Sequence, residues 1–136
     1  MGLCYMDETF RKQALEWLDR GNHDIETAQL LYDNRGHTES IAFHIHQALE
    51  KYLKGYIIIF GKKPPRIHDL DSLLNHIIPF DKDLSEFMNL CEKVSLYYIE
   101  SRYPPGTLVQ YEYTEIKSDL EKAWEIIRKI RKKLDL

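Results

Sequence analysis

The segment from residue 38 to residue 60 constrains the fold most, because its apolar side chains recur with the period of an α-helix over several turns. The recurring residues stand at i, i+4, i+8, i+11 and i+15, and they are Ile41, Ile45, Leu49, Tyr52 and Tyr56. Such a stripe predicts a helix with one buried face. Gly61 and the pair Pro64 and Pro65 end this helix, because proline cannot donate a backbone hydrogen bond within it.

Apolar residues recur at helical spacings in four further segments. We expect helices over residues 9–33, 68–78, 83–102 and 114–134. Residues 103–113 alternate only weakly and have no partner strand elsewhere, so we expect a loop there. A chain of 136 residues with 43% hydrophobic residues can build one core. The prediction is a single all-α domain over residues 1–136: an up-down antiparallel four-helix bundle with one additional short helix.

Capping residues predict where the helices begin and end. The expected caps are Thr38 and Asp69 at two N-termini, Asp83 with Glu86 as a capping box, and Gly36 after the first helix. Gly21 lies inside the first helix, where glycine is unfavourable. It therefore indicates either a kink or close contact with a neighbouring helix.

Composition and spacing exclude several classes of protein. Cys4 and Cys91 make neither a disulfide framework nor a zinc set, and Cys91 is expected in the core. His44 and His46 stand two residues apart on one helix and cannot share a metal, so we expect no metal and no other cofactor. The chain lacks a signal-peptide pattern and a membrane-length apolar run, which predicts a cytoplasmic protein without membrane contact. Its net charge of −3 requires any phosphate contact to come from a local basic cluster.

Three polar clusters are candidates for such a contact. In the first, Gln47, Lys51 and Lys54 fall at i, i+4 and i+7, which places an amide and two cations on one helix face. That arrangement could hold a phosphate. The alternative is that both lysines are solvated surface groups, with Glu50 nearby.

The second cluster is Arg66 and His68, just before the short helix, where helix N–H groups favour anions. Simple capping chemistry explains these residues equally well. The third is Arg102, which shares an apolar stripe with Tyr98 and is expected to point into the bundle. A partly buried guanidinium needs a partner, and Asp24 is the candidate. A purely structural ion pair is the alternative to a ligand site.

Taken together, these segments resemble the HEPN family. The matching segments are Trp17 with AQLLY of residues 28–32, FHIHQALEKYLK of residues 43–54, HDL of residues 68–70, and SRYP of residues 101–104. The resemblance implies a four-helix up-down bundle with a short extra helix, a cytoplasmic homodimer, and binding of a nucleotide or of RNA. It also implies pairing with a minimal nucleotidyltransferase in a toxin–antitoxin-like system.

This sequence departs from the family's ribonucleases, which use an Arg followed four to six residues later by His. Arg102 stands at the corresponding helix end, but no arginine of this chain has a histidine at that spacing. Tyr103 and Tyr111 would replace it poorly, because an unperturbed tyrosine titrates near pH 10.

The favoured hypothesis is therefore a non-catalytic homodimer. Its expected phosphate-binding residues are Gln47, Lys51, Lys54, His68 and Arg102, supported by Asp24 and Tyr103. A second hypothesis is a ribonuclease in which Arg102 acts with another imidazole, His46 or His68. A third is a ligand-free adaptor dimer. Its aromatic contact surface would be Tyr97, Tyr98, Tyr103 and Tyr111, although burial of these tyrosines in the core explains them equally well.

Overall fold

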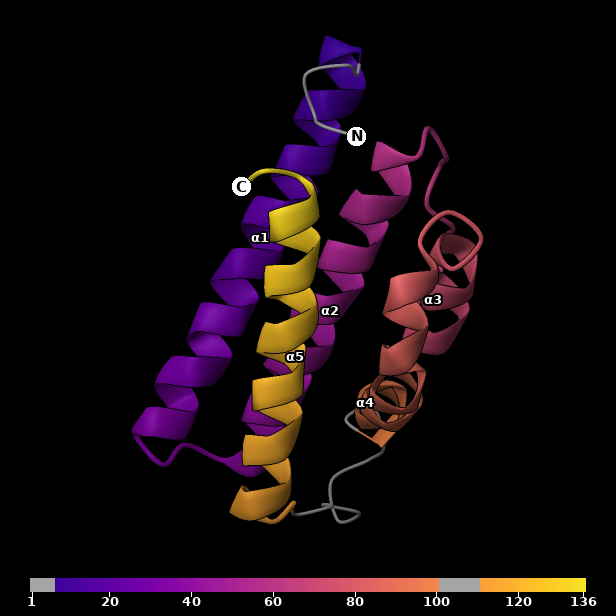
Figure 1. The fold of residues 1–136 in the computed structure, drawn as a ribbon. Helices are drawn as coiled ribbons and strands as arrows, with labels where there is room; N and C mark the ends of the chain where they lie inside the picture. Colours follow the sequence, from indigo (N-terminus) through magenta and orange to yellow (C-terminus); the bar gives the residue numbers. More distant parts are fainter. Residues whose placement is uncertain (1–6, 101–110) are drawn as a thin grey trace.

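The computed structural model describes residues 7–100 and 111–136, and these residues form helices joined by short connections. The α-helices are α1 (Glu8–Asp33), α2 (Thr38–Ile59), α3 (Leu70–Ile77), α4 (Met88–Glu100) and α5 (Tyr113–Lys133), with a 3₁₀ helix η2 (Lys82–Phe87) before α4 (Figure 1). The described part of the chain contains no strand. The predicted all-α class is confirmed.

Helix α2 lies at the centre of the molecule and packs against α1, α3, α4 and α5. Its predicted apolar stripe is buried along its whole length, with Ile41, Ile45, Leu49 and Tyr52 fully inaccessible. Helix α1 runs antiparallel to α2, whereas α5 runs alongside in the same direction as α2 (Figure 1). Helices α3 and α4 cover the other side of α2.

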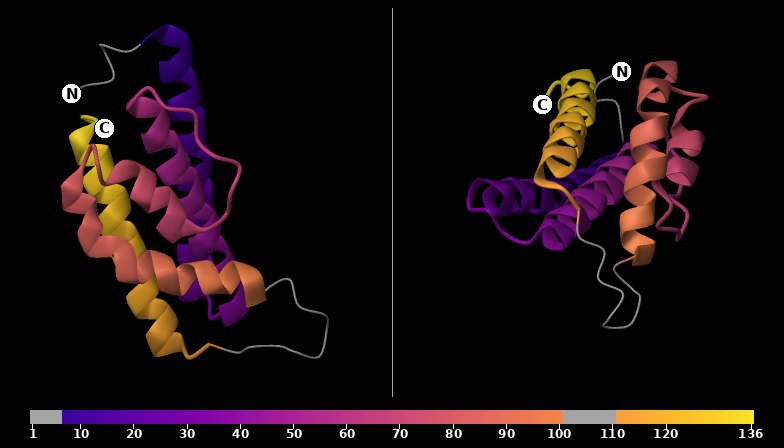
Figure 2. Two further views of the ribbon diagram at one scale, coloured as in Figure 1. Left: turned by 90° about the vertical axis from the view of Figure 1, so that its right-hand side faces the viewer. Right: turned by 90° about the horizontal axis from the view of Figure 1, so that it is seen from below.

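Helix α4 departs from the direction that a regular up-down bundle would give it. The left view of Figure 2 shows α4 crossing α5 steeply, while α1, α2 and α5 run along one another. Ridges-into-grooves packing allows steep crossings as well as near-parallel ones. Polar residues of α2 on the side that faces α4 therefore contact a helix that crosses α2 steeply.

Two predicted N-caps are wrong. Thr38 is the first residue of α2, and His37 precedes it as the cap residue. The Thr38 hydroxyl instead accepts a hydrogen bond of 3.2 Å from the backbone N–H of Tyr111, which ties α2 to the start of α5. In η2 the capping side chain is Asp81, which accepts from the N–H of Asp83, so the expected capping box at Asp83 does not form.

The ends of α1 and α3 differ from expectation in a similar way. After α1, the left-handed residue is Arg35 (φ 55°), and Gly36 donates its N–H to the Leu31 carbonyl at 2.7 Å. Gly36 is therefore not the residue that needs positive φ. Asp69 is the N-cap residue of α3, as predicted, but its side chain makes no cap bond, and the Leu70 N–H donates to Ser95 Oγ of α4 at 2.8 Å. A side chain of the neighbouring helix α4, rather than that of Asp69, therefore bonds a backbone N–H at the start of α3.

Asp81 joins three elements near the C-terminal end of α5. Its carboxylate accepts from the Tyr56 hydroxyl at 2.7 Å and from Lys133 Nζ at 2.6 Å. Burial pushes the pKa of Asp81 upward, but the bonds from Lys133 and Tyr56 outweigh that effect and hold the pKa below its ordinary value of 3.8. The ionised carboxylate thus ties α2, η2 and α5 together.

Two glycines allow α1 and α2 to approach closely. A Cβ built on Gly21 would lie 2.5 Å from Cδ2 of Tyr52, and one on Gly55 would lie 3.0 Å from Cδ2 of Leu18. Helix α1 continues through Gly21. Of the two expectations for Gly21, the structure bears out close contact with a neighbouring helix.

Replacing Gly21 with alanine should destabilise the fold. The added methyl group collides with the fully buried Tyr52 ring, and overpacking of this kind outweighs the better helix propensity of alanine, giving a net loss of about 1–2 kcal/mol. Urea unfolding followed by circular dichroism measures the difference. Asp19→Ala, an exposed position on the same helix, is the control. A Gly21→Ala variant as stable as that control would contradict the packing argument.

Candidate functional site

The polar face of α2 is organised by two carboxylates, each shared between one lysine and one histidine. Asp24 of α1 accepts from His44 Nδ1 at 3.2 Å through one oxygen and from Lys51 Nζ through the other. We call these three residues the Asp24 group.

The second carboxylate repeats this pattern. Glu50 accepts from His68 Nδ1 at 2.8 Å through one oxygen and from Lys54 Nζ at 3.2 Å through the other. We call these three residues the Glu50 group. In both groups the carboxylate binds the Nδ1 edge of the imidazole, so the Nε2 edge points away from it.

The two groups differ in how far they are withdrawn from water. In the Glu50 group, the side chains of Glu50 and Lys54 are only 7% and 8% exposed, whereas that of His68 is 48% exposed. The indole of Trp17 lies 5.6 Å from Lys54 Nζ and covers it. A buried lysine needs a paired carboxylate, because an unpaired charge out of water is costly. Lys54 is therefore not the solvated group that the alternative interpretation expected.

The Asp24 group is more open, and Gln47 lies between the two groups. The side chains of Lys51 and His44 are 24% and 27% exposed. Gln47 stands three residues before Glu50 and four before Lys51, which makes it the neighbour of both on the helix surface. The side-chain amide of Gln47 thus lies between two lysine–histidine pairs, one belonging to the Asp24 group and the other to the Glu50 group.

His46 holds the backbone of His68 in place. It is fully buried, and its Nε2 donates to the carbonyl oxygen of His68 at 2.9 Å. Burial lowers its pKa below the ordinary 6.5 despite the nearby Glu50, so the ring is neutral. Its Nδ1 faces the side-chain amide of Gln47 at 3.5 Å. Both ring nitrogens are thus engaged within the fold.

The ring of Tyr98 from α4 stacks on both histidines of this region. Its centroid lies 5.0 Å from that of His46 and 4.5 Å from that of His68, with interplanar angles of 23° and 24°. The neighbouring Tyr97 is buried, donates to Asp119 and packs against Tyr111. Of the two roles expected for Tyr97, burial in the core is the one observed. The prediction that Tyr97 belongs to an exposed contact surface is wrong.

The structure brings together four of the predicted binding residues, namely Gln47, Lys51, Lys54 and His68. Arg102 and Tyr103 lie outside the described residues. The described partners of Asp24 are Lys51 and His44, where Arg102 was expected.

Four residues of the site were absent from the predicted set: Trp17, His44, Glu50 and Tyr98. Two of them had a signal in the sequence. The i, i+4 spacing of Glu50 and Lys54 and the i, i+7 spacing of His44 and Lys51 place each pair on one side of α2. The stacking of Tyr98 had no such signal, because it depends on how α4 crosses α2.

Metal and thiol chemistry find no support in the described part of the chain. It contains no group of three or more His, Cys, Asp or Glu side chains that could hold a metal ion. Cys91 is buried, and burial raises the pKa of its thiol to about 12, which keeps it protonated. Over the same residues, none of the helices combines the length and apolarity that crossing a bilayer requires.

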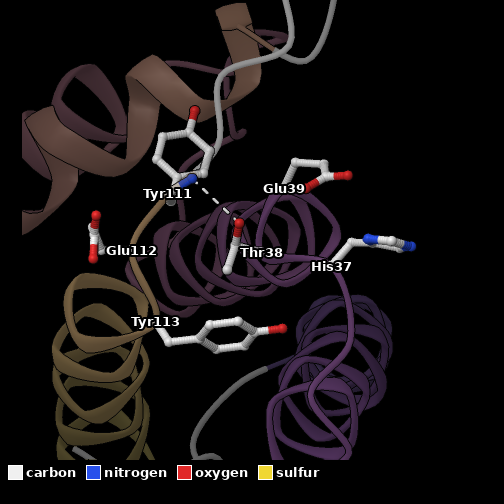
Figure 3. Close-up of a pocket in the computed structure, with 6 residues that line it drawn as sticks. All are labelled: His37, Thr38, Glu39, Tyr111, Glu112 and Tyr113. Carbon is white, nitrogen blue, oxygen red and sulfur yellow. Dashed lines mark hydrogen bonds between the residues drawn. The ribbon is translucent and has the colours of Figure 1, made fainter.

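A separate hollow of about 340 Å³ lies where the N-terminus of α2 meets the start of α5 (Figure 3). Its lining includes the carboxylates of Glu39 and Glu112 and, among the described residues, no lysine or arginine. The Tyr113 hydroxyl is engaged as a donor to the carbonyls of Arg35 and Gly36. Two carboxylates disfavour a phosphate, so this hollow is a poorer candidate than the face of α2.

Comparison with known families adds to this geometry. The model of the HEPN domain matches residues 14–135. The chain belongs to the HEPN family. The match includes every described residue of the Asp24 and Glu50 groups, so the site lies within the HEPN domain itself.

A solved structure shares this HEPN fold. The crystal structure of TT1696 from Thermus thermophilus superposes with a TM-score of 0.75 at 26% sequence identity, and the alignment covers 90% of this chain and 98% of that one. No match was found among curated proteins.

The neutral, buried state of His46 predicts an acid-sensitive component of stability. Its folded pKa is lowered, so its contribution is present above about pH 6.5 and is lost as the pH falls through that value toward the folded pKa. The variant His46→Gln keeps a donor for the His68 carbonyl but cannot titrate. We expect the melting temperature of the wild type to fall more steeply between pH 7.5 and pH 5.5 than that of the variant. If the melting temperatures of the wild type and of His46→Gln fall in parallel over this pH range, His46 is not the buried neutral group that we infer.

Proposed function

We propose that this HEPN domain is a non-catalytic module that binds the phosphate of a nucleotide or of RNA on the polar face of α2. The expected ligand contacts are Gln47, Lys51 and His68, with Arg102 as a further cation. Lys54 supports the site from within, because it is buried against Glu50 and Trp17. No arginine of the sequence is followed by a histidine at the spacing of the ribonuclease motif, which favours binding over cleavage.

The observation that carries this proposal is the position of Lys51. Its ammonium group is partly exposed, Gln47 is one turn away, and Asp24 anchors it from α1. A lysine held by a carboxylate keeps two further N–H donors that a phosphate oxygen can accept from. His44, which shares the Asp24 carboxylate with Lys51, turns its Nε2 edge away from that carboxylate.

Family membership also supports the assembly that we propose. A cytoplasmic homodimer, a four-helix core and a minimal nucleotidyltransferase partner in a toxin–antitoxin-like system all follow from the resemblance to HEPN proteins. A dimer would place two such α2 faces in one particle.

Removing the Lys51 ammonium group should weaken phosphate binding. Charge-assisted hydrogen bonds contribute about 1.5–3 kcal/mol, so Lys51→Ala should reduce affinity by about ten- to a hundredfold. Calorimetry with ATP, GTP and short single-stranded RNA measures this. Lys122→Ala, an exposed lysine of α5, is the matched control, and Arg102→Ala tests the remaining predicted cation. If the wild type binds none of the three ligands, the proposal is wrong.

One contact favours ribonuclease activity as a second candidate function. Glu50 orients His68 through Nδ1 at 2.8 Å, which leaves the Nε2 edge of this half-exposed side chain for proton transfer. His68 would take the proton of a ribose 2′-hydroxyl while that oxygen attacks the phosphorus. The departing 5′-oxygen would then receive a proton, either the one held by His68 or one from water, leaving a 2′,3′-cyclic phosphate. His46 is unsuited to this role, because it is buried and both its ring nitrogens are engaged.

The two candidate functions predict different outcomes with RNA. We expect the purified protein to bind single-stranded RNA and leave it intact over hours, as followed by gel electrophoresis. Cleavage that is lost in both His68→Ala and Arg102→Ala, and retained in His76→Ala, would replace the binding module with the ribonuclease.

A further inference from the structure

The stacked rings of His46, Tyr98 and His68 lead from the core to the surface. His46 is fully buried, Tyr98 is partly buried, and the His68 side chain is 48% exposed. Both histidines lie within 24° of parallel to the tyrosine ring. The outermost member of this stack is therefore an imidazole that water reaches.

Three contacts fix the position of the His68 ring. Tyr98 packs against its face at 4.5 Å, Glu50 accepts from its Nδ1 at 2.8 Å, and His46 holds its backbone carbonyl at 2.9 Å. One face and one edge of the ring are thus occupied. Because that face and that edge are occupied, we infer that the exposed part of the side chain is the opposite face and the Nε2 edge. A ring held in this way loses little freedom when another planar group stacks on it.

We propose that the exposed face of His68 is the platform for a nucleobase, so that the ligand of this site is a nucleotide or single-stranded RNA rather than phosphate alone. This inference rests on the phosphate-binding function proposed above. Base stacking on aromatic side chains is favourable for every base, because each base has a π-face. The platform lies on the lysine-bearing side of α2, since His68 and the buried Lys54 share the carboxylate of Glu50, and Lys51 stands three residues before Lys54 on the same helix.

This arrangement divides recognition between two groups of residues. The Asp24 group, through Lys51, holds the phosphates, and His68 with Tyr98 beneath it holds the base. Stacking strength rather than hydrogen bonding then sets the base preference. Purine nucleotides bind more tightly than pyrimidine nucleotides, and ATP and GTP bind alike.

A comparison of ATP with inorganic tripolyphosphate separates the two parts of the site. Calorimetry with the full chain is done for the wild type, His68→Ala, His68→Phe and Lys51→Ala. His68→Ala should lose about ten- to a hundredfold in affinity for ATP and less than about threefold for tripolyphosphate. His68→Phe keeps an aromatic ring and should retain most of the ATP affinity. Lys51→Ala should weaken both ligands.

His76→Ala, which removes another exposed histidine, is the control variant and should change neither affinity. Far-ultraviolet circular dichroism confirms that each variant is folded. Equal losses for ATP and tripolyphosphate in His68→Ala would overturn the platform and leave the phosphate site standing. An ATP affinity of His68→Ala equal to that of the wild type would also overturn the platform and leave the phosphate site standing. A wild type that binds neither ligand would remove both proposals.

Discussion

The enclosure of α2 by the other helices is the constraint on which the rest of the structure depends. Four helices pack around it, and its second half is buried on nearly every side. A charged side chain that is buried on this helix must find a partner within the protein, because an isolated buried charge is too costly. Within the described residues, no buried side-chain nitrogen or oxygen lacks a hydrogen-bond partner. Glu50 and Lys54 meet this requirement by pairing with each other.

The site follows from that requirement. Asp24 and Glu50 each have two oxygens, and each divides them between a lysine and a histidine. Pairing fixes the imidazoles in orientation and turns their Nε2 edges away from the carboxylates. Groups held by carboxylates in this way are preorganised, which lowers the entropic cost of binding a ligand. The same contacts that make α2 compatible with burial therefore also build the surface proposed to bind a phosphate and a base.

Much of this protein follows from local patterns in the sequence. The stripe from Ile41 to Tyr56 predicted α2 and its buried face, and the stop at Gly61 agrees with the end of the helix. Local rules were less successful at the caps. Thr38, Asp83 and Gly36 all have the right residue types for caps. The Thr38 hydroxyl instead bonds the N–H of Tyr111, and Asp81 rather than Asp83 caps η2. Arg35 rather than Gly36 adopts the left-handed conformation after α1. A cap depends on which polar group another segment brings near, and no local pattern records that.

The sequence by itself determined the all-helical class, the helix over residues 38–60 with its buried face, and the segment that carries Gln47, Lys51 and Lys54. Helical periodicity is a property of neighbouring residues, so it can be recognised without knowing the fold. Tertiary structure alone decided that Asp24 pairs with Lys51 and His44, and that Tyr98 stacks on His68. Each of these contacts joins different elements of the chain. Their formation depends on how α1 and α4 cross α2, which is set by the packing of whole helices.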